Sequence, residues 1–231
     1  MRCAIMQPTY LPWAGYFNLI SQVDIFVFLD DVQFERQSWQ SRNRILLEGK
    51  EHWLSIPTHV KSHTQRFDMI QIDFSRRWQR KHVLRLEQAY QKAPYFEHIR
   101  GILKLILNAD DVTVVDLNIS IVEEISKALN LQTVFRKASV LNLPGSRSQH
   151  LLNICEALEC QEYLSPLGSQ TYLLEDGLFQ SSSIQLDFQD YTTQPYSQLK
   201  SSIFRSHLSI LDLIANIGIQ KAAKYVMSSI S

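Results

Sequence analysis

The pattern of apolar and polar positions at the start of the chain predicts a strand, a helix and a second strand. Residues 3–6 form a short apolar segment, and a helix is expected over residues 13–22 after a turn that contains two prolines. Residues 25–29 are an uninterrupted apolar run that ends at Asp30 and Asp31. Such a run is typical of a parallel strand buried on both faces. The three elements span about 30 residues and therefore predict a βαβ unit.

The middle of the chain has a different pattern. Residues 43–47 and 52–56 flank Glu48-Gly49-Lys50 and predict a hairpin. A short strand is expected at 70–73, and helices are expected at 76–91 and 117–129. Between those helices, apolar residues recur with the i, i+3, i+4, i+7, i+8 spacing of a helix face: Ile99, Ile102, Leu103, Ile106 and Leu107.

The last third returns to alternating strands and helices. Strands are expected at 133–135, 163–164 and 184–188. Ser146 and Gln149 have the spacing of a capping box ahead of a helix, and a last helix is expected over 206–217, ended by Gly218. These elements predict a single α/β domain over 1–231, with a Rossmann-like, mostly parallel sheet flanked by helices. A hairpin and helices at approximately 43–129 form an insertion in it.

Composition and charge narrow the class of protein. The 231 residues include 23 Lys plus Arg and 23 Asp plus Glu, so the formal net charge is zero. This balance argues against a general nucleic-acid binder. The three cysteines form no CxxC pair, which argues against a zinc site and a disulfide framework and favours a cytoplasmic location. No uncharged apolar stretch reaches about 18 residues, and the N-terminus lacks a signal-peptide pattern, so no membrane insertion is expected.

Polar residues directly follow the first two predicted strands. Ligands of open parallel sheets bind outside the carboxyl ends of the strands. If the two strands are neighbours, then Gln7, Asp30, Asp31 and Gln33 should line one substrate-binding crevice. The alternative is that the two aspartates cap the turn that follows the second strand.

The segment 8–16 combines two prolines, three aromatic residues and a glycine. Tyr10, Trp13 and Tyr16 are candidates for stacking on a sugar or a base, and Gly15 permits close approach of a ligand or another backbone. The alternative is that these aromatic residues are the buried face of the first helix, and this is our interpretation of the neighbouring Phe17.

A second candidate binding segment contains Arg42, Asn43 and Arg44. Arginine binds phosphate or carboxylate in bidentate fashion, so an anion site is one interpretation and a solvated surface is the other. Asp31 and His207 are the candidate catalytic bases. Asp31 would need desolvation or a nearby charge to act as a base at pH 7. His59 and His63 have the HxxxH spacing that places two metal ligands on one face of a helix. The residues around them lack helical periodicity, so we predict no metal site.

Several of these segments resemble the WbqC-like family. The resemblance lies in IMQPTYLPWAGYF at 5–17, DDVQF at 30–34 and RNRI at 42–45, with shorter pieces at 93–96, 165–168, 194–196 and 208–212. It implies a role in bacterial O-antigen or other surface-polysaccharide biosynthesis, as a transferase that adds an acyl or aminoacyl group to a nucleotide-linked amino sugar. It implies a small-molecule substrate and identifies no cofactor and no catalytic residue.

A more distant likeness is to nucleotidyltransferases with an HxGH motif. WAGY at 13–16 stands where HxGH would be, and neither Trp nor Tyr supplies the cation that those histidines provide. Two alternatives therefore accompany the transferase hypothesis. One is a non-catalytic protein that binds nucleotide sugars, and the other is a divergent nucleotidyltransferase.

Overall fold

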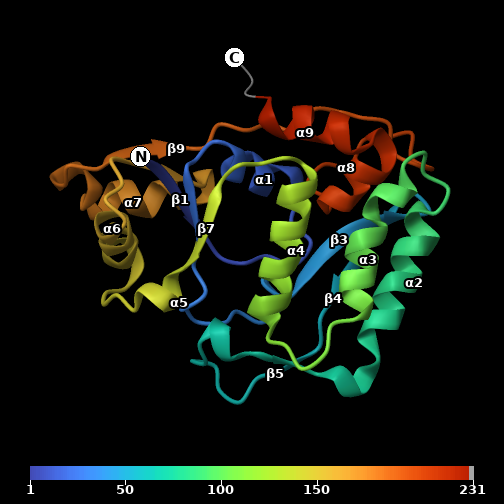
Figure 1. Ribbon diagram of the computed structural model, residues 1–231, viewed down its shortest axis with the longest axis horizontal. Coiled ribbons are helices and arrows are strands. Elements are labelled where there is room, and N and C mark those ends of the chain that lie inside the picture. The colour runs from blue at the N-terminus through green and yellow to red at the C-terminus, as the bar shows by residue number, and fades with distance from the viewer. Residues whose placement is uncertain (229–231) are drawn as a thin grey trace.

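The centre of the computed structural model is a parallel β-sheet (Figure 1). The structure describes residues 1–228. In spatial order β7-β2-β1-β8-β9, the sheet strands are β7 (Val134–Lys137), β2 (Ile25–Phe28), β1 (Arg2–Met6), β8 (Glu162–Ser165) and β9 (Gln185–Phe188). The predicted Rossmann-like α/β fold is therefore confirmed.

The strand order defines one switch point in the sheet. From β1 the chain moves outward to β2 and then β7, and it returns to the other side of β1 for β8 and β9. In register, Met6 lies beside Phe28 of β2, and Cys3 lies beside Tyr163 of β8. The order reverses between β1 and β8, and this is where open α/β sheets bind ligands.

Alternate side chains of the central strands enter two separate cores, as a period of two requires. Ala4 and Phe26 belong to the cluster that contains buried residues of α1 and α4, whereas Cys3 and Val27 belong to the cluster with α6. The sheet is thus covered on both faces, which explains its continuous apolar runs. The first cluster contains residues from α1 (Ala14–Ser21), α4 (Val114–Ala128), α8 (Ile210–Ile217) and α9 (Ile219–Met227), and the second from α5 (Ala138–Leu141), α6 (Arg147–Ala157) and α7 (Gln170–Asp176).

The predicted insertion follows β2 and precedes β7. Its hairpin pairs β3 (Arg42–Leu47) with β4 (Lys50–Ser55), and a second small sheet pairs β5 (Thr58–His59) with β6 (Gln71–Ile72). Helices α2 (Trp78–Tyr90) and α3 (Arg100–Leu107) follow and lie at the opposite end of the molecule from α5, α6 and α7 (Figure 1). Short 3₁₀ turns occupy Phe67–Met69, Phe74–Arg76, Phe96–Ile99, Leu167–Ser169 and Phe179–Ser181.

Two predicted helices begin later in the chain than expected. The helix expected from residue 206 begins at Ile210, because His207 has a left-handed backbone (φ 59°) and the Ser209 side chain accepts the Leu211 N–H as a cap. A further helix, α9, follows Gly218. Likewise α2 begins after Arg77, whose φ of 48° interrupts the helical backbone.

The capping box predicted ahead of α6 is also absent. The Ser146 side chain makes no cap hydrogen bond. The Gln149 amide donates instead to Asn153 Oδ1 at 2.8 Å. The helix itself is present and buries the predicted apolar residues Leu151 and Cys155.

Within residues 1–228, none of the helices combines the length and apolar character that a membrane crossing requires.

Candidate functional site

A cavity of about 600 Å³ opens at the switch point of the sheet. Met6 and Gln7 line it at the end of β1, and Pro166, Gly168 and Ser169 line it after β8. Five Trp and Tyr side chains contribute to its wall: Trp13, Tyr16, Trp39, Tyr163 and Tyr172. Its polar lining comprises Gln7, Thr9, Glu35, Ser38, Gln40, Asn43, Ser169 and His207.

A network of amides fixes one side of the cavity. Gln40 is almost completely buried, and its Nε2 donates to Gln7 Oε1 at 2.9 Å while its Oε1 accepts the Glu35 N–H at 2.8 Å. The Asn118 amide donates to the Gln40 carbonyl at 2.7 Å and to the Pro8 carbonyl at 3.2 Å. Gln7 and Gln40 are therefore held in place before any ligand binds, which lowers the entropic cost of recognition.

Asn43 holds the proline-containing turn that follows β1. Its Nδ2 donates to the Tyr10 carbonyl at 3.0 Å and to the Leu11 carbonyl at 2.8 Å. Leu11 has a left-handed backbone with φ of 46°, so these bonds stabilise an otherwise unfavourable conformation. Asn43 is buried and lines the cavity, and its amide donors are used within the protein.

The two aromatic residues of the WAGY segment both line the cavity. The Tyr16 hydroxyl donates to the Gln7 carbonyl at 3.1 Å, and burial raises the pKa of Tyr16 well above its usual value. The Trp13 indole lies across Gly15, where an added Cβ would stand 2.2 Å from the ring. The close approach predicted at Gly15 is therefore made by Trp13 of the same segment.

His207 reaches the cavity from the loop that precedes α8. Its ring packs on Trp13, and its Nδ1 lies 2.8 Å from Ser206 Oγ. Desolvation and the nearby Arg44 guanidinium lower the pKa of His207. Both effects favour the neutral imidazole, which is the protonation state that a general base needs.

The two aspartates after β2 do not line this cavity. Asp30 is buried and accepts hydrogen bonds from the Ser139 N–H at 2.8 Å and the Ser139 hydroxyl at 2.6 Å, in the first turn of α5. Asp31 pairs with His150 Nε2 at 3.0 Å. Both aspartates connect β2 to the helices on one face of the sheet, which is close to the capping alternative considered for them.

Four other predicted binding residues also lie away from the cavity lining. Tyr10 is completely buried, and its hydroxyl lies 2.9 Å from His82 Nδ1. Gln33 is exposed and donates to the His63 carbonyl at 2.7 Å. Arg42 and Arg44 lie on the outer face of the β3–β4 hairpin, and Arg44 pairs with Glu51 at 2.8 Å.

Several cavity residues were not predicted: Glu35, Trp39, Gln40, Ser169 and Tyr172. The sequence contains an indication of Ser169 as a site residue, because it directly follows the segment 165–168 at the end of a predicted strand. That strand becomes informative only when it is placed beside β1, and hydrophobic patterning does not give strand order. Gln40 and Trp39 lie in a loop without periodicity, where sequence patterns carry little information.

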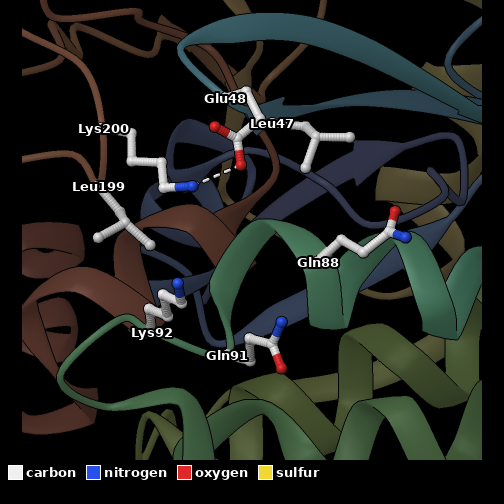
Figure 2. A pocket seen from close by; sticks show the side chains of 7 residues that line it. All are labelled: Leu47, Glu48, Gln88, Gln91, Lys92, Leu199 and Lys200. Atoms are coloured by element: carbon white, nitrogen blue, oxygen red, sulfur yellow. Dashed lines mark hydrogen bonds and ion pairs between the residues drawn. The ribbon is translucent and has the colours of Figure 1, made fainter.

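A second hollow lies at the tip of the hairpin, between Glu48, Gln88 and Lys200 (Figure 2). Its volume is about 340 Å³, and an ion pair between Lys200 and Glu48 crosses one side of it. None of the predicted site residues lines it. Separately, among residues 1–228 no group of three or more His, Cys, Asp or Glu side chains is placed to hold a metal ion.

The strand order and the switch-point cavity define the class of protein: a Rossmann-like α/β protein with a cavity at the position where such sheets bind ligands. Residues 7–224 match the WbqC-like protein family, and the chain belongs to that family. It is also 31% identical over 220 residues to the uncharacterized protein Rv1507c of Mycobacterium tuberculosis, with 94% of each chain covered. No solved structure matches the chain.

Proposed function

We propose that this protein is a group transferase that acylates the amino group of a nucleotide-linked sugar, or of a related precursor of a bacterial surface glycan. The observation that carries the proposal is the cavity between β1 and β8, the position at which Rossmann-like sheets bind nucleotide-containing ligands. Its volume of about 600 Å³ is in the range of small-molecule sites.

The lining of the cavity suits a sugar. Sugars present hydroxyl groups around an apolar ring face, and the cavity offers both kinds of partner. Trp13 and Tyr172 supply aromatic surfaces, while Gln7, Thr9 and Ser169 supply hydrogen-bonding groups.

His207 is the base that we assign to the reaction. The sugar amine attacks the carbonyl carbon of an activated acyl donor, such as a thioester or an aminoacyl ester. The carbon–nitrogen bond forms, the bond to the donor's leaving group breaks with its electron pair, and His207 takes the proton from the nitrogen. We favour His207 over Asp31 because His207 lines the cavity, whereas Asp31 is paired with His150.

We place this reaction in the cytoplasm. The three cysteines are free thiols, although Cys3 Sγ and Cys155 Sγ lie only 3.6 Å apart. Unlinked thiols at this separation fit a reducing compartment better than an oxidising one.

The test is to incubate the purified protein with nucleotide-linked amino sugars and acyl donors and to follow the masses of the sugars. The expected result is a sugar heavier by one acyl group, formed by the wild type and lost in His207→Gln. Retention of a sugar without any product would indicate the non-catalytic binding alternative. Pyrophosphate release from a nucleoside triphosphate and a sugar phosphate would indicate the divergent nucleotidyltransferase instead.

A further inference from the structure

Two exposed tryptophans lie side by side next to the cavity. The exposed fractions of Trp39 and Trp53 are 47% and 42%, and their ring centroids are 5.4 Å apart with the planes inclined by 37°. Large aromatic side chains are usually buried, and exposed ones that cluster indicate a binding surface.

Two arginines pack against these indoles. The Arg42 guanidinium carbon lies 4.4 Å from the Trp53 ring centroid, and that of Arg44 lies 5.5 Å from Trp39 and 5.8 Å from Trp53. Arg44 and Trp53 face each other across the β3–β4 ladder, and Arg42 is two residues away on the same face. We call Trp39, Arg42, Arg44 and Trp53 the arginine–tryptophan face.

The two arginines differ in their partners. Arg44 is neutralised in part by Glu51 and donates to the His207 carbonyl at 3.4 Å. The Arg42 side chain has neither an ion pair nor a hydrogen bond to any group in residues 1–228, and its Nε, like that of Arg44, is buried without a partner. Its charge is therefore available to an anion, and arginine binds phosphate oxygens in bidentate geometry.

The arginine–tryptophan face is continuous with the cavity. Trp39 belongs to both, because it lines the cavity and contacts Trp53. Arg44 connects the face to His207 on the cavity wall. A ligand that extends out of the cavity past Trp39 meets first the arginines and then the exposed indoles.

We infer that the arginine–tryptophan face binds the nucleoside diphosphate part of the substrate while the sugar occupies the cavity. The base stacks on Trp53 and Trp39, and the diphosphate pairs with Arg42. A neutral glycan or an apolar chain would leave the Arg42 cation without a partner, whereas a nucleoside diphosphate provides both a planar ring and an anion. This inference rests on the proposed function, since it assigns the second half of the same substrate.

The experiment is calorimetric titration of the full chain with UDP, CDP, GDP and ADP, and separately with an amino-sugar 1-phosphate that has no base. At least one nucleoside diphosphate should bind the wild type. Trp53→Ala and Arg42→Gln should each weaken that binding about tenfold, and Trp53→Phe should recover most of it. The sugar 1-phosphate should bind Trp53→Ala within about twofold of the wild type.

Leu84→Ala and Arg80→Ala are the matched controls, because they remove an exposed apolar residue and an exposed arginine on α2. Both should bind like the wild type. The inference is overturned if no nucleoside diphosphate binds, or if Trp53→Ala and Arg42→Gln bind as tightly as the controls.

The outcomes separate this inference from the proposed function. If nucleoside diphosphate binding depends on Trp53 and Arg42 but no acyl transfer occurs, the inference is supported and the transferase activity is excluded. If acyl transfer occurs to a sugar whose binding is unchanged by substitution of either residue, the transferase is supported and the inference is overturned.

Discussion

The indole of Trp13 lies against the imidazole of His207, with ring centroids 4.5 Å apart and planes inclined by 35°. One residue comes from the turn after β1, and the other from the loop that precedes α8. An antiparallel bridge between Trp13 and Ser209 holds the two segments together. The proposed base is therefore positioned by the WAGY segment, although the two lie nearly 200 residues apart in the sequence.

The first prediction concerns the pH dependence of transfer. His207 must be neutral to accept a proton, and its pKa is lowered by desolvation and by Arg44. The acidic limb of kcat/KM should therefore fall below the ordinary histidine value of about 6.5. Arg44→Gln removes the neighbouring positive charge and should move this limb to higher pH, whereas the α2 control Arg80→Ala should not. An unchanged limb in Arg44→Gln would remove His207 as the titrating base.

The second prediction uses two glycines that line or support the same cavity. A Cβ at residue 15 would stand 2.2 Å from the Trp13 ring, whereas a Cβ at residue 168 would have no atom within 4 Å. Gly15→Ala must displace Trp13 and should cost about 1–3 kcal/mol of unfolding free energy and weaken sugar binding. Gly168→Ala should unfold and bind like the wild type. Denaturant unfolding and calorimetry measure both effects, and equal behaviour of the two variants would contradict this account of Trp13.

Much of the sheet could be predicted from local pattern. The apolar run at 25–29 and the polar residues that follow it gave β2 and its carboxyl end, because a strand covered on both faces has few polar positions. The neighbour relation of β1 and β2 followed from the short connection between them. Five of the predicted site residues line one cavity in the structure: Gln7, Trp13, Tyr16, Asn43 and His207.

The location of the cavity could be predicted only in part. The sequence predicts a crevice between the ends of β1 and β2, whereas the cavity also extends to the β8 side of β1, where Tyr163, Pro166 and Ser169 line it. Which strand occupies that side depends on long-range pairing, which local hydrophobic periodicity does not encode. The direction of the Asp30 and Asp31 side chains likewise depended on Ser139 and His150, more than 100 residues further along the chain.

The third prediction separates a structural from a catalytic role for Asp31. Asp31 and His150 have side chains less than 10% exposed, and their hydrogen bond raises the pKa of His150. A raised histidine pKa stabilises the fold below about pH 6.5, and this contribution is lost as the pH rises through the folded-state value. Asp31→Asn should lower the unfolding free energy at pH 6 by roughly 1–3 kcal/mol. It should also reduce the decline of the unfolding free energy with rising pH above pH 6.5.

The same variant can be compared with His207→Gln in the transfer assay. Loss of a general base should reduce turnover by roughly 10²- to 10⁴-fold. The turnover of folded Asp31→Asn protein should fall far less, because Asp31 is outside the cavity lining. Equal losses of turnover in the two variants would indicate that Asp31 takes part in the reaction.

The fourth prediction concerns the opposite pH window. His82 is buried against Tyr10 and Trp78, and desolvation lowers its pKa to about 4. Between pH 6.5 and pH 4 the unfolded chain binds a proton that folded His82 does not, so the unfolding free energy should fall by about 3 kcal/mol over this range. His82→Gln should flatten that decline, and this window does not overlap with the effect of His150 above pH 6.5. His63→Gln removes an exposed histidine, leaves His82 in place and should retain the wild-type decline. Denaturant unfolding at half-unit pH intervals measures the slopes, and an identical slope in both variants would exclude His82 as the source.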